Sequence, residues 1–251
     1  MFGSALAQRE LLKRSPLFSC LGDKETDTML AHANVARYSA GEEIFAKGDP
    51  GNSMMAVLRG RIQISAPSPD GRQMVLTVMH EGEVFGEIAL LDGKERTADA
   101  IALSDCELLV VPRRPFLDLL ERRPELSVGL LVVLCERLRR TNEQVEDLAF
   151  LDLEARIAKT LLRLAHEAEA DAARGVAGAG VGGLRLAHQA EAVSGASRIG
   201  VKISQRALGE LVGGSRESVN KHLQDFKRLG IIEIEKGAIV IRDIGGLAAC
   251  L

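Results

Sequence analysis

A short stretch of the chain combines the residue types that bind a phosphodiester. Residues 85–98 have the sequence FGEIALLDGKERTA. Gly86 permits a backbone conformation that turns main-chain N–H groups toward a phosphate, and the planar guanidinium of Arg96 can give paired hydrogen bonds to its oxygens. Thr97 adds a hydroxyl donor. Glu87 would repel a phosphate, so it needs a donor of its own, such as a ribose 2′-hydroxyl. The stretch therefore predicts a site for a ribose-linked phosphodiester.

A second informative segment lies near the C-terminus. Residues 202–230 have the sequence KISQRALGELVGGSRESVNKHLQDFKRLG. Ser204 and Ser215 are suited to cap two consecutive helices, because a serine hydroxyl accepts a hydrogen bond from an unpaired N–H at a helix start. The first helix would run through Leu211, and Val212-Gly213-Gly214 would form the turn. This layout predicts a helix-turn-helix, whose second helix enters the DNA major groove.

The second helix presents side chains that can read base edges near its N-terminus. Arg216 can pair with guanine O6 and N7, Glu217 can accept from cytosine N4, and Lys221 can reach guanine or a phosphate. Four apolar residues at helical spacing are expected in the core instead: Val219, Leu223, Phe226 and Leu229. In the following segment, 230–241, apolar and polar residues alternate on either side of a central glycine. This pattern predicts a β-hairpin, the wing of a winged helix-turn-helix.

The order and spacing of these two motifs resemble the catabolite activator protein family, also called the cAMP receptor protein or CRP/FNR family. The resemblance extends over residues 17–242. It implies that Arg96 and Thr97 hold a cyclic phosphate and that Glu87 and Gly86 hold the ribose. It also implies a chain controlled by a bound cyclic nucleotide.

The same resemblance assigns the base contacts to a long helix in the middle of the chain. Thr141 and Asn142 match the pair of residues that contact adenine in this family, one from each subunit of a dimer. In cGMP-binding domains a threonine also occurs at the position that matches Thr97, where its hydroxyl reaches a syn guanine. The expected ligand is therefore cAMP first and cGMP second.

The elements that position these residues follow from the hydrophobic pattern. A short helix is expected over 23–34. Between residues 35 and 111, short apolar runs alternate with turns containing Gly, Pro and Asp, which indicates an antiparallel sandwich or barrel. A hairpin with one buried face is predicted from the alternation of Ile62, Ile64, Met74, Leu76 and Val78, with Asp70-Gly71 at its tip.

From residue 115 to about 169 the apolar residues recur at helical spacing. The segment is too apolar for a single exposed helix. It packs either in the core of its own chain or against a second copy across a dimer axis, and the family resemblance favours the dimer. Residues 171–200 are rich in Ala and Gly, with five glycines between 175 and 183, and predict an exposed linker or insertion.

The predicted fold class is α+β, with an N-terminal antiparallel β-sandwich or barrel, a long dimerisation helix and a C-terminal winged helix-turn-helix. The expected division is a cyclic-nucleotide-binding domain over 15–124, a dimerisation helix over 125–170, the insertion over 171–200 and the DNA-binding domain over 201–251.

Composition argues against several classes of protein. The 251-residue chain has no uncharged apolar run long enough to span a membrane and no secretory signal, so a cytoplasmic protein is expected. Its four cysteines form no CxxC spacing, so neither a disulfide framework nor a metal site is expected. The dispersed histidines form no catalytic constellation, so an enzyme is not expected.

The predicted function is that of a homodimeric, sequence-specific transcription regulator, allosterically controlled by a cyclic nucleotide. Its expected partners are double-stranded DNA with a palindromic TGTGA-like site and RNA polymerase. Two alternatives stay open. One is a ligand-independent regulator of the same family with a vestigial pocket. The other is a regulatory nucleotide module for an enzyme or channel, against which the helix-turn-helix argues.

Overall fold

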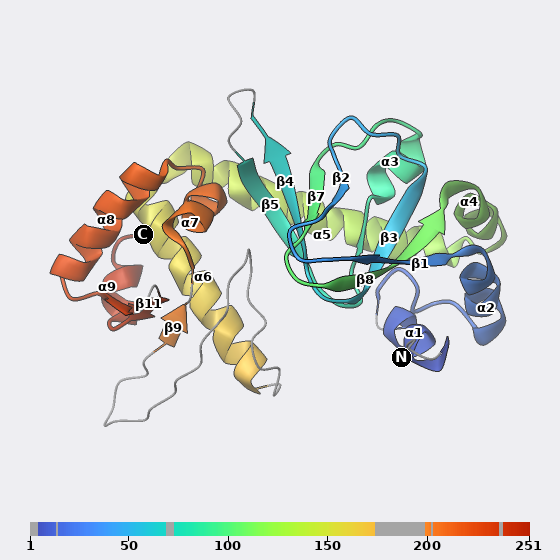
Figure 1. The fold of residues 1–251 in the computed structure, drawn as a ribbon, viewed down its shortest axis with the longest axis horizontal. Coiled ribbons are helices and arrows are strands. Elements are labelled where there is room, and N and C mark those ends of the chain that lie inside the picture. The colour runs from blue at the N-terminus through green and yellow to red at the C-terminus, as the bar shows by residue number, and fades with distance from the viewer. Residues whose placement is uncertain (1–4, 14, 69–72, 174–198, 202, 236–237) are drawn as a thin grey trace. The chain divides into compact units, whose positions relative to one another are not determined.

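A computed structural model describes residues 5–13, 15–68, 73–173, 199–201, 203–235 and 238–251 (Figure 1). The chain divides into two units, Met1–Asn142 and Glu143–Leu251.

The first unit contains two four-stranded antiparallel sheets, which confirms the predicted β-sandwich or barrel. The strand order of one sheet is β1-β8-β3-β6, formed by Asn34–Tyr38, Cys106–Pro112, Ser53–Arg59 and Val84–Phe85. The order of the other is β2-β7-β4-β5, formed by Glu43–Phe45, Asp99–Ala102, Ile62–Pro67 and Gln73–Met79.

The central strands of the first sheet, β3 and β8, are buried on both faces, and successive side chains of a strand point to opposite sides. On β8, Leu108 packs into a cluster with Ile62 of the second sheet. Leu109 and Val111 pack into a separate cluster with residues of five helices. These helices are α1 (Ala5–Lys13), α2 (Asp23–His32), α3 (Glu87–Asp92), α4 (Arg113–Arg122) and α5 (Glu125–Phe150). The helix expected over 23–34 is confirmed as α2, whereas α1 was not predicted.

The predicted β4–β5 hairpin forms, but its buried face differs from strict alternation. The pairing register shifts between Ile64 and Ser65. As a result Ile62, Ser65, Val75 and Val78 are buried, whereas three residues expected on the buried face are only half-buried: Ile64, Met74 and Leu76. An inserted residue of this kind changes which side chains face inward beyond it. The predicted tip, Asp70-Gly71, lies outside the described residues.

The range predicted as one dimerisation helix, 125–170, is divided in the structure. Helix α5 spans Glu125–Phe150 and α6 spans Leu153–Ala173. The Asp152 carboxylate accepts a hydrogen bond from the Ala155 N–H at 2.9 Å, so Asp152 begins a new helix. The apolar spacing continues across this junction, which is why the sequence pattern did not reveal it.

The second unit contains α6 and a winged helix-turn-helix. Its elements are β9 (Ile199–Val201), α7 (Gln205–Val212), α8 (Arg216–Arg228), β10 (Ile232–Glu235), β11 (Ala238–Ile241) and α9 (Ile244–Ala248). The three strands form an antiparallel sheet in the order β10-β11-β9, which confirms the wing hairpin. Helix α6 packs against β9, α7 and α9.

Residues 174–198, which are most of the predicted insertion over 171–200, lie outside the described residues. Its first residues belong to the end of α6 and its last two to β9. Among the helices that the structure describes, none combines the length and the apolar composition that a membrane crossing requires.

Candidate functional site

The predicted phosphate-binding stretch forms a short helix with a glycine at each end. Helix α3 spans Glu87–Asp92, and both flanking glycines adopt the left-handed conformation, Gly86 with φ +77° and Gly93 with φ +71°. A Cβ on Gly86 would lie 2.5 Å from Nη1 of Arg96. Glycine at position 86 is therefore required both by the backbone and by the close approach of the arginine.

Arg96 lies beneath this helix start with its guanidinium withdrawn from solvent. The residue is 5% exposed, and its Nη1 donates to the Gly86 carbonyl at 2.8 Å. Its Nη2 donates to Ser53 Oγ at 3.2 Å, and the guanidinium carbon lies 4.3 Å from the ring centroid of Phe45. Ser53 and Phe45 were not predicted from the sequence, because they lie on separate strands outside the motif.

The charge of Arg96 is not neutralised by an ion pair. No carboxylate forms a salt bridge with it among the described residues, and its buried Nε has no hydrogen-bond partner there. Burial lowers the pKa of the Arg96 guanidinium, and the nearby carboxylates of Asp49 and Glu87 act in the opposite direction. A buried cation with an unsatisfied donor is a suitable partner for an anion.

Glu87 is fully buried, and one of its oxygens is bound by an arginine that the sequence reasoning missed. Nη1 of Arg137, on α5, donates to Glu87 Oε1, and Nη2 donates to the Val84 carbonyl. Oε2 of Glu87 has no partner among the described residues. This oxygen is an acceptor that a ribose hydroxyl could satisfy. The signal for Arg137 was its position four residues before Thr141, on the same helix face.

The structure brings together three of the predicted ligand residues: Gly86, Glu87 and Arg96. We call these three the cradle. Thr97 follows Arg96 directly and is exposed. Thr141 and Asn142 are exposed on α5, and no hydrogen bond joins them to the cradle within the described part of the chain.

The helix-turn-helix has the predicted caps. Ser204 Oγ accepts from the Ala207 N–H at 3.1 Å, and Ser215 Oγ accepts from the Ser218 N–H at 3.1 Å. Helix α7 ends at Val212, one residue later than expected, and Gly213 closes it with φ +67°. The turn therefore requires a left-handed residue, which glycine supplies.

The side chains expected to read DNA are all exposed on α8: Arg216, Glu217 and Lys221. Three of the residues expected in the core are buried, namely Val219, Leu223 and Phe226. The prediction that Leu229 is buried is wrong, because it is 66% exposed. It is the C-cap of α8 and precedes Gly230, which has φ +75°, so the helical spacing no longer applies there.

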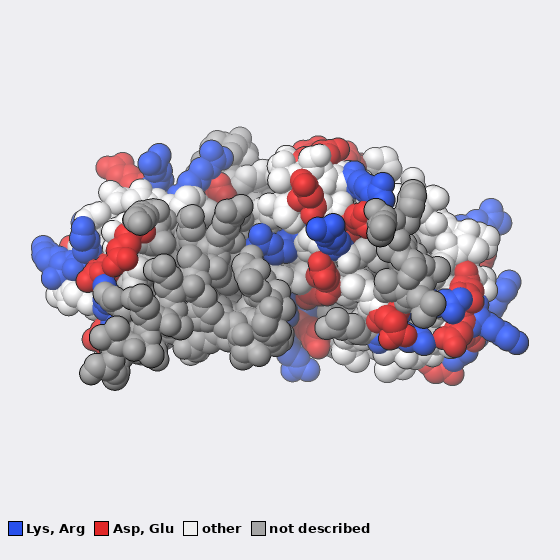
Figure 2. All heavy atoms as spheres, turned by 60° about the horizontal axis from the view of Figure 1, so that its bottom comes forward, with Lys and Arg blue, Asp and Glu red and all other residues white. Residues whose placement is uncertain are grey.

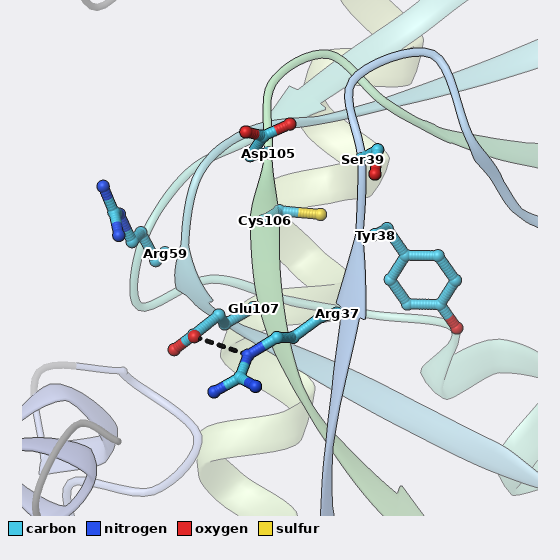
Figure 3. A pocket seen from close by; sticks show the side chains of 7 residues that line it. All are labelled: Arg37, Tyr38, Ser39, Arg59, Asp105, Cys106 and Glu107. Carbon is cyan, nitrogen blue, oxygen red and sulfur yellow. Dashed lines mark hydrogen bonds and ion pairs between the residues drawn. The ribbon is translucent and has the colours of Figure 1, made fainter. Parts of the chain in front are cut away.

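A surface hollow of about 320 Å³ lies elsewhere on the first sheet. It is lined by residues 37–39, Arg59 and residues 105–107, and none of the predicted ligand residues borders it. Figure 3 shows Arg37 and Glu107 pointing toward each other, and Arg37 Nε donates to Glu107 Oε1 at 2.9 Å. The two arginines that line this hollow are accompanied by two carboxylates, Asp105 and Glu107. The hollow therefore differs from the cradle, where the Arg96 guanidinium has no carboxylate paired with it among the described residues.

Charge is mixed over the face that Figure 2 shows, where Lys and Arg are interspersed with Asp and Glu among the described residues. The C-terminal range 201–251 contains eight basic and six acidic residues. The formal charge of this range is therefore only +2, a small basic excess.

Two family models match the two halves of the chain. The model described as "Cyclic nucleotide-binding domain" matches residues 35–123, which contain the cradle. The model described as "Crp-like helix-turn-helix domain" matches residues 155–250, from the start of α6 through α9.

Similar proteins are transcription regulators. The "CRP-like cAMP-activated global transcriptional regulator" of Mycobacterium tuberculosis is 32% identical, over 95% of this chain and 97% of its own length. The solved c-di-GMP responsive global regulator CLP of Xanthomonas campestris is 26% identical with a TM-score of 0.72, covering 88% of this chain and 99% of that one.

A solved CRP/FNR family regulator from Thermus thermophilus is 28% identical with a TM-score of 0.66, covering 86% of this chain and 97% of that one. The order of the helices and strands, the two matching family models and the similar proteins all indicate the same family. The chain belongs to the CRP/FNR family of DNA-binding transcription regulators, which carry a cyclic-nucleotide-binding domain and are not enzymes.

Proposed function

We propose that this protein is a homodimeric transcription regulator whose affinity for a specific DNA site is controlled by a bound cyclic nucleotide. The proposal depends on the chemistry of the cradle. Among the described residues, its buried Arg96 guanidinium forms no ion pair, and one oxygen of its buried Glu87 carboxylate has no hydrogen-bond partner. A ribose cyclic phosphate offers an anion to the first and a hydroxyl donor to the second.

Binding would relieve the unfavourable burial of these groups. A buried polar atom without a partner costs about 1–3 kcal/mol, and more when it is charged. Arg96 would hold the cyclic phosphate, with Thr97 adding a hydroxyl donor. Glu87 Oε2 would accept from the ribose 2′-hydroxyl while Oε1 keeps its bond to Arg137. Gly86 leaves the space that this arrangement needs.

We infer cAMP as the first choice of ligand and cGMP as the second. The relative from M. tuberculosis is named as cAMP-activated, which favours cAMP for a chain of 32% identity. Thr97 keeps cGMP open, because its exposed hydroxyl could also reach a syn guanine. The resemblance assigns the base to Thr141 and Asn142.

The dimer is proposed from a stripe of exposed residues on α5. Seven residues follow one another at alternating three- and four-residue steps, and all are exposed: Val128, Leu131, Cys135, Leu138, Asn142, Val145 and Ala149. We call this stripe the seam. Such spacing is typical of the a and d positions of a coiled coil, and a polar Asn at one a position favours two parallel strands in register. A second copy of the same helix is the partner that this pattern fits.

The seam and the residue that binds the cradle, Arg137, lie on different faces of α5. Arg137, bound to Glu87, and Thr141 lie one turn apart on one face. Asn142 belongs to the seam. This arrangement favours a contact from Thr141 to the ligand of its own subunit and from Asn142 to that of the partner. A ligand that contacts both Thr141 of its own subunit and Asn142 of the partner would change the relative position of the two α5 helices in the dimer. A coupling free energy of about 1–3 kcal/mol between nucleotide binding and DNA binding would change DNA affinity roughly 5–150-fold.

DNA recognition is proposed for α8. Arg216, Glu217 and Lys221 would read base edges, with Ser204 and Ser215 fixing the helix starts. A two-fold dimer matches a palindromic site, and we propose a TGTGA-like half-site. RNA polymerase is the proposed protein partner.

Titration calorimetry of the full chain with cAMP and then cGMP tests the nucleotide site. Micromolar or tighter binding of one nucleotide is expected in the wild type, and its loss in Arg96→Ala. Arg59→Ala is the matched control, since this arginine is exposed on β3 and lies outside the cradle. The absence of binding in folded, dimeric wild type would favour the alternative of a ligand-independent regulator. Arg96 would then be structural, bound to Gly86 and Ser53 as observed.

A further inference from the structure

The turn of the helix-turn-helix is fastened to the junction between α5 and α6 by one arginine. Nε of Arg156, on α6, donates to the carbonyl of Val212 at 3.0 Å, and its Nη1 donates to the carbonyl of Leu151 at 2.8 Å. Val212 is the last residue of α7, and Leu151 directly follows α5. One guanidinium therefore binds the ends of two helices at once.

These two carbonyls are suitable targets for a fixed cation. The last carbonyls of a helix have no partner within it and lie at the negative end of the helix dipole. A guanidinium has donors in a rigid planar arrangement, so it can hold two acceptors in a defined relative position, which a lysine ammonium does not reproduce.

Two apolar contacts reinforce the same connection. A Cβ on Gly214 would lie 2.8 Å from Cδ1 of Leu153, and a Cβ on Gly213 would lie 3.4 Å from Cδ2 of Leu148. Leu148 belongs to α5 and Leu153 begins α6. The turn is thus packed against both sides of the junction, and at position 214 it leaves no room for a Cβ.

The two helices after the junction are also tied to each other. Gln205 of α7 donates through Nε2 to Asn220 Oδ1 of α8 at 2.8 Å. The Gly214 N–H donates to the Gly209 carbonyl at 2.9 Å. A displacement that reaches the end of α7 would therefore carry α8 with it.

We propose that Arg156 is a positioning residue that transmits the pose of α5 to the DNA-reading helix. It fixes Val212 to Leu151, so that a displacement of α5 moves the turn and is not absorbed at the Leu151–Asp152 junction. The source of that displacement, a nucleotide acting on α5, rests on the proposed function. The connection itself rests only on contacts within the second unit.

The test compares Arg156→Lys and Arg156→Met with Lys159→Met in the full chain. Lys159 also bridges the junction, through an ion pair with Asp147, but it makes no contact with the turn among the described residues. For each protein, cAMP affinity is measured by calorimetry and DNA affinity by fluorescence anisotropy with and without saturating cAMP. Amide hydrogen exchange is measured over 147–151 and 209–214.

The expected result is a loss of coupling without a loss of ligand binding. In both Arg156 variants cAMP affinity stays within twofold of wild type, while the gain in DNA affinity on adding cAMP shrinks at least fivefold. The lysine variant retains more of the gain than the methionine variant. Lys159→Met keeps the gain within twofold of wild type. An equal fall of DNA affinity with and without cAMP, or no change, would overturn the proposal, since either result leaves Arg156 with a purely structural role or none.

The exchange measurement separates this inference from the proposed function. If wild-type DNA affinity does not respond to cAMP, nucleotide control fails, and exchange then decides the role of Arg156. Faster exchange over both 147–151 and 209–214 in the Arg156 variants, but not in Lys159→Met, would uphold the connection. A change confined to one of these segments, or absent from both, would contradict it.

Discussion

Arg137 of helix α5 donates a hydrogen bond to the fully buried carboxylate of Glu87 in the cradle. Its other terminal nitrogen donates to the carbonyl of Val84, two residues before Gly86 of the cradle. A charged, partly buried hydrogen bond therefore connects the proposed phosphate site to the helix that carries the seam. A ligand that engages Glu87 would act on a group already bonded to this helix.

The Glu87–Arg137 pair should be strongly coupled in stability. Arg137→Met would leave the Glu87 carboxylate buried without its cation, and a loss of about 3 kcal/mol in the free energy of unfolding is expected. Glu87→Gln combined with Arg137→Met should cost less than the sum of the single changes. Urea unfolding of the four proteins in a double-mutant cycle measures the coupling. Additive single effects would show that the contact contributes little.

Cys135 provides a direct probe of the seam. In a parallel, in-register dimer the two copies of Cys135 face each other at equivalent a positions, within reach of a disulfide. Copper phenanthroline oxidation should give a dimer band on a non-reducing gel, absent in Cys135→Ser. In that background Leu138→Cys, on the seam, should restore the band, and the exposed off-seam Glu136→Cys should not. Equal cross-linking at positions 136 and 138 would contradict the seam.

The first unit should lose stability in alkaline solution. Burial raises the pKa of the Cys106 thiol to about 11, and burial also raises the pKa of its cross-strand neighbour Tyr38. A raised pKa in the folded state means that the contribution to stability is complete below the unfolded-state value and is lost as pH rises through the folded-state value. The free energy of unfolding should therefore fall between about pH 9 and 11.

Cys106→Ala combined with Tyr38→Phe should flatten this pH dependence, even if the absolute stability is lower. Urea unfolding at several pH values between neutrality and pH 11 measures the slope. A slope unchanged by the double variant would place the alkaline sensitivity elsewhere.

The residues of α8 that we propose to read DNA should contribute to sequence discrimination, unlike other exposed cations of that helix. Arg216→Ala should cost about 1–3 kcal/mol at the preferred site and relax discrimination at one base pair, because a bidentate contact to guanine is lost. Arg228→Ala is the control, since this exposed residue pairs with Asp225 at the far end of α8. Its effect should be small and independent of sequence. Anisotropy titrations against a panel of single-base variants at fixed salt distinguish the two. A uniform loss for Arg216→Ala would assign it to the DNA backbone.

The sequence predicted best what is encoded locally. Gly86, Glu87 and Arg96 lie within one stretch of eleven residues, so the motif was enough to predict that they meet. The two serine caps follow from chemistry within a single helical turn. Arg137 is distant in sequence from Glu87, and its place one helical turn before Thr141 does not by itself show that its side chain reaches that carboxylate.

Periodicity predicted helices better than their ends. Leu229 continues the apolar spacing of α8, but the helix has already ended and the side chain is exposed. The break at Leu151–Asp152 was hidden for the same reason, since apolar residues recur on both sides of it. In both cases the end is set by a capping interaction or a left-handed glycine, which a hydrophobic pattern does not record.

Control of DNA affinity by a cyclic nucleotide in the cradle is measured by fluorescence anisotropy of a labelled palindromic TGTGA-type duplex at fixed salt, with no nucleotide, with cAMP and with cGMP. We expect cAMP to raise the affinity of the wild type by roughly 5–150-fold, cGMP to have a smaller effect, and Arg96→Ala to respond to neither. Equal affinity of the wild type under all three conditions, matched by Arg96→Ala, would refute nucleotide control.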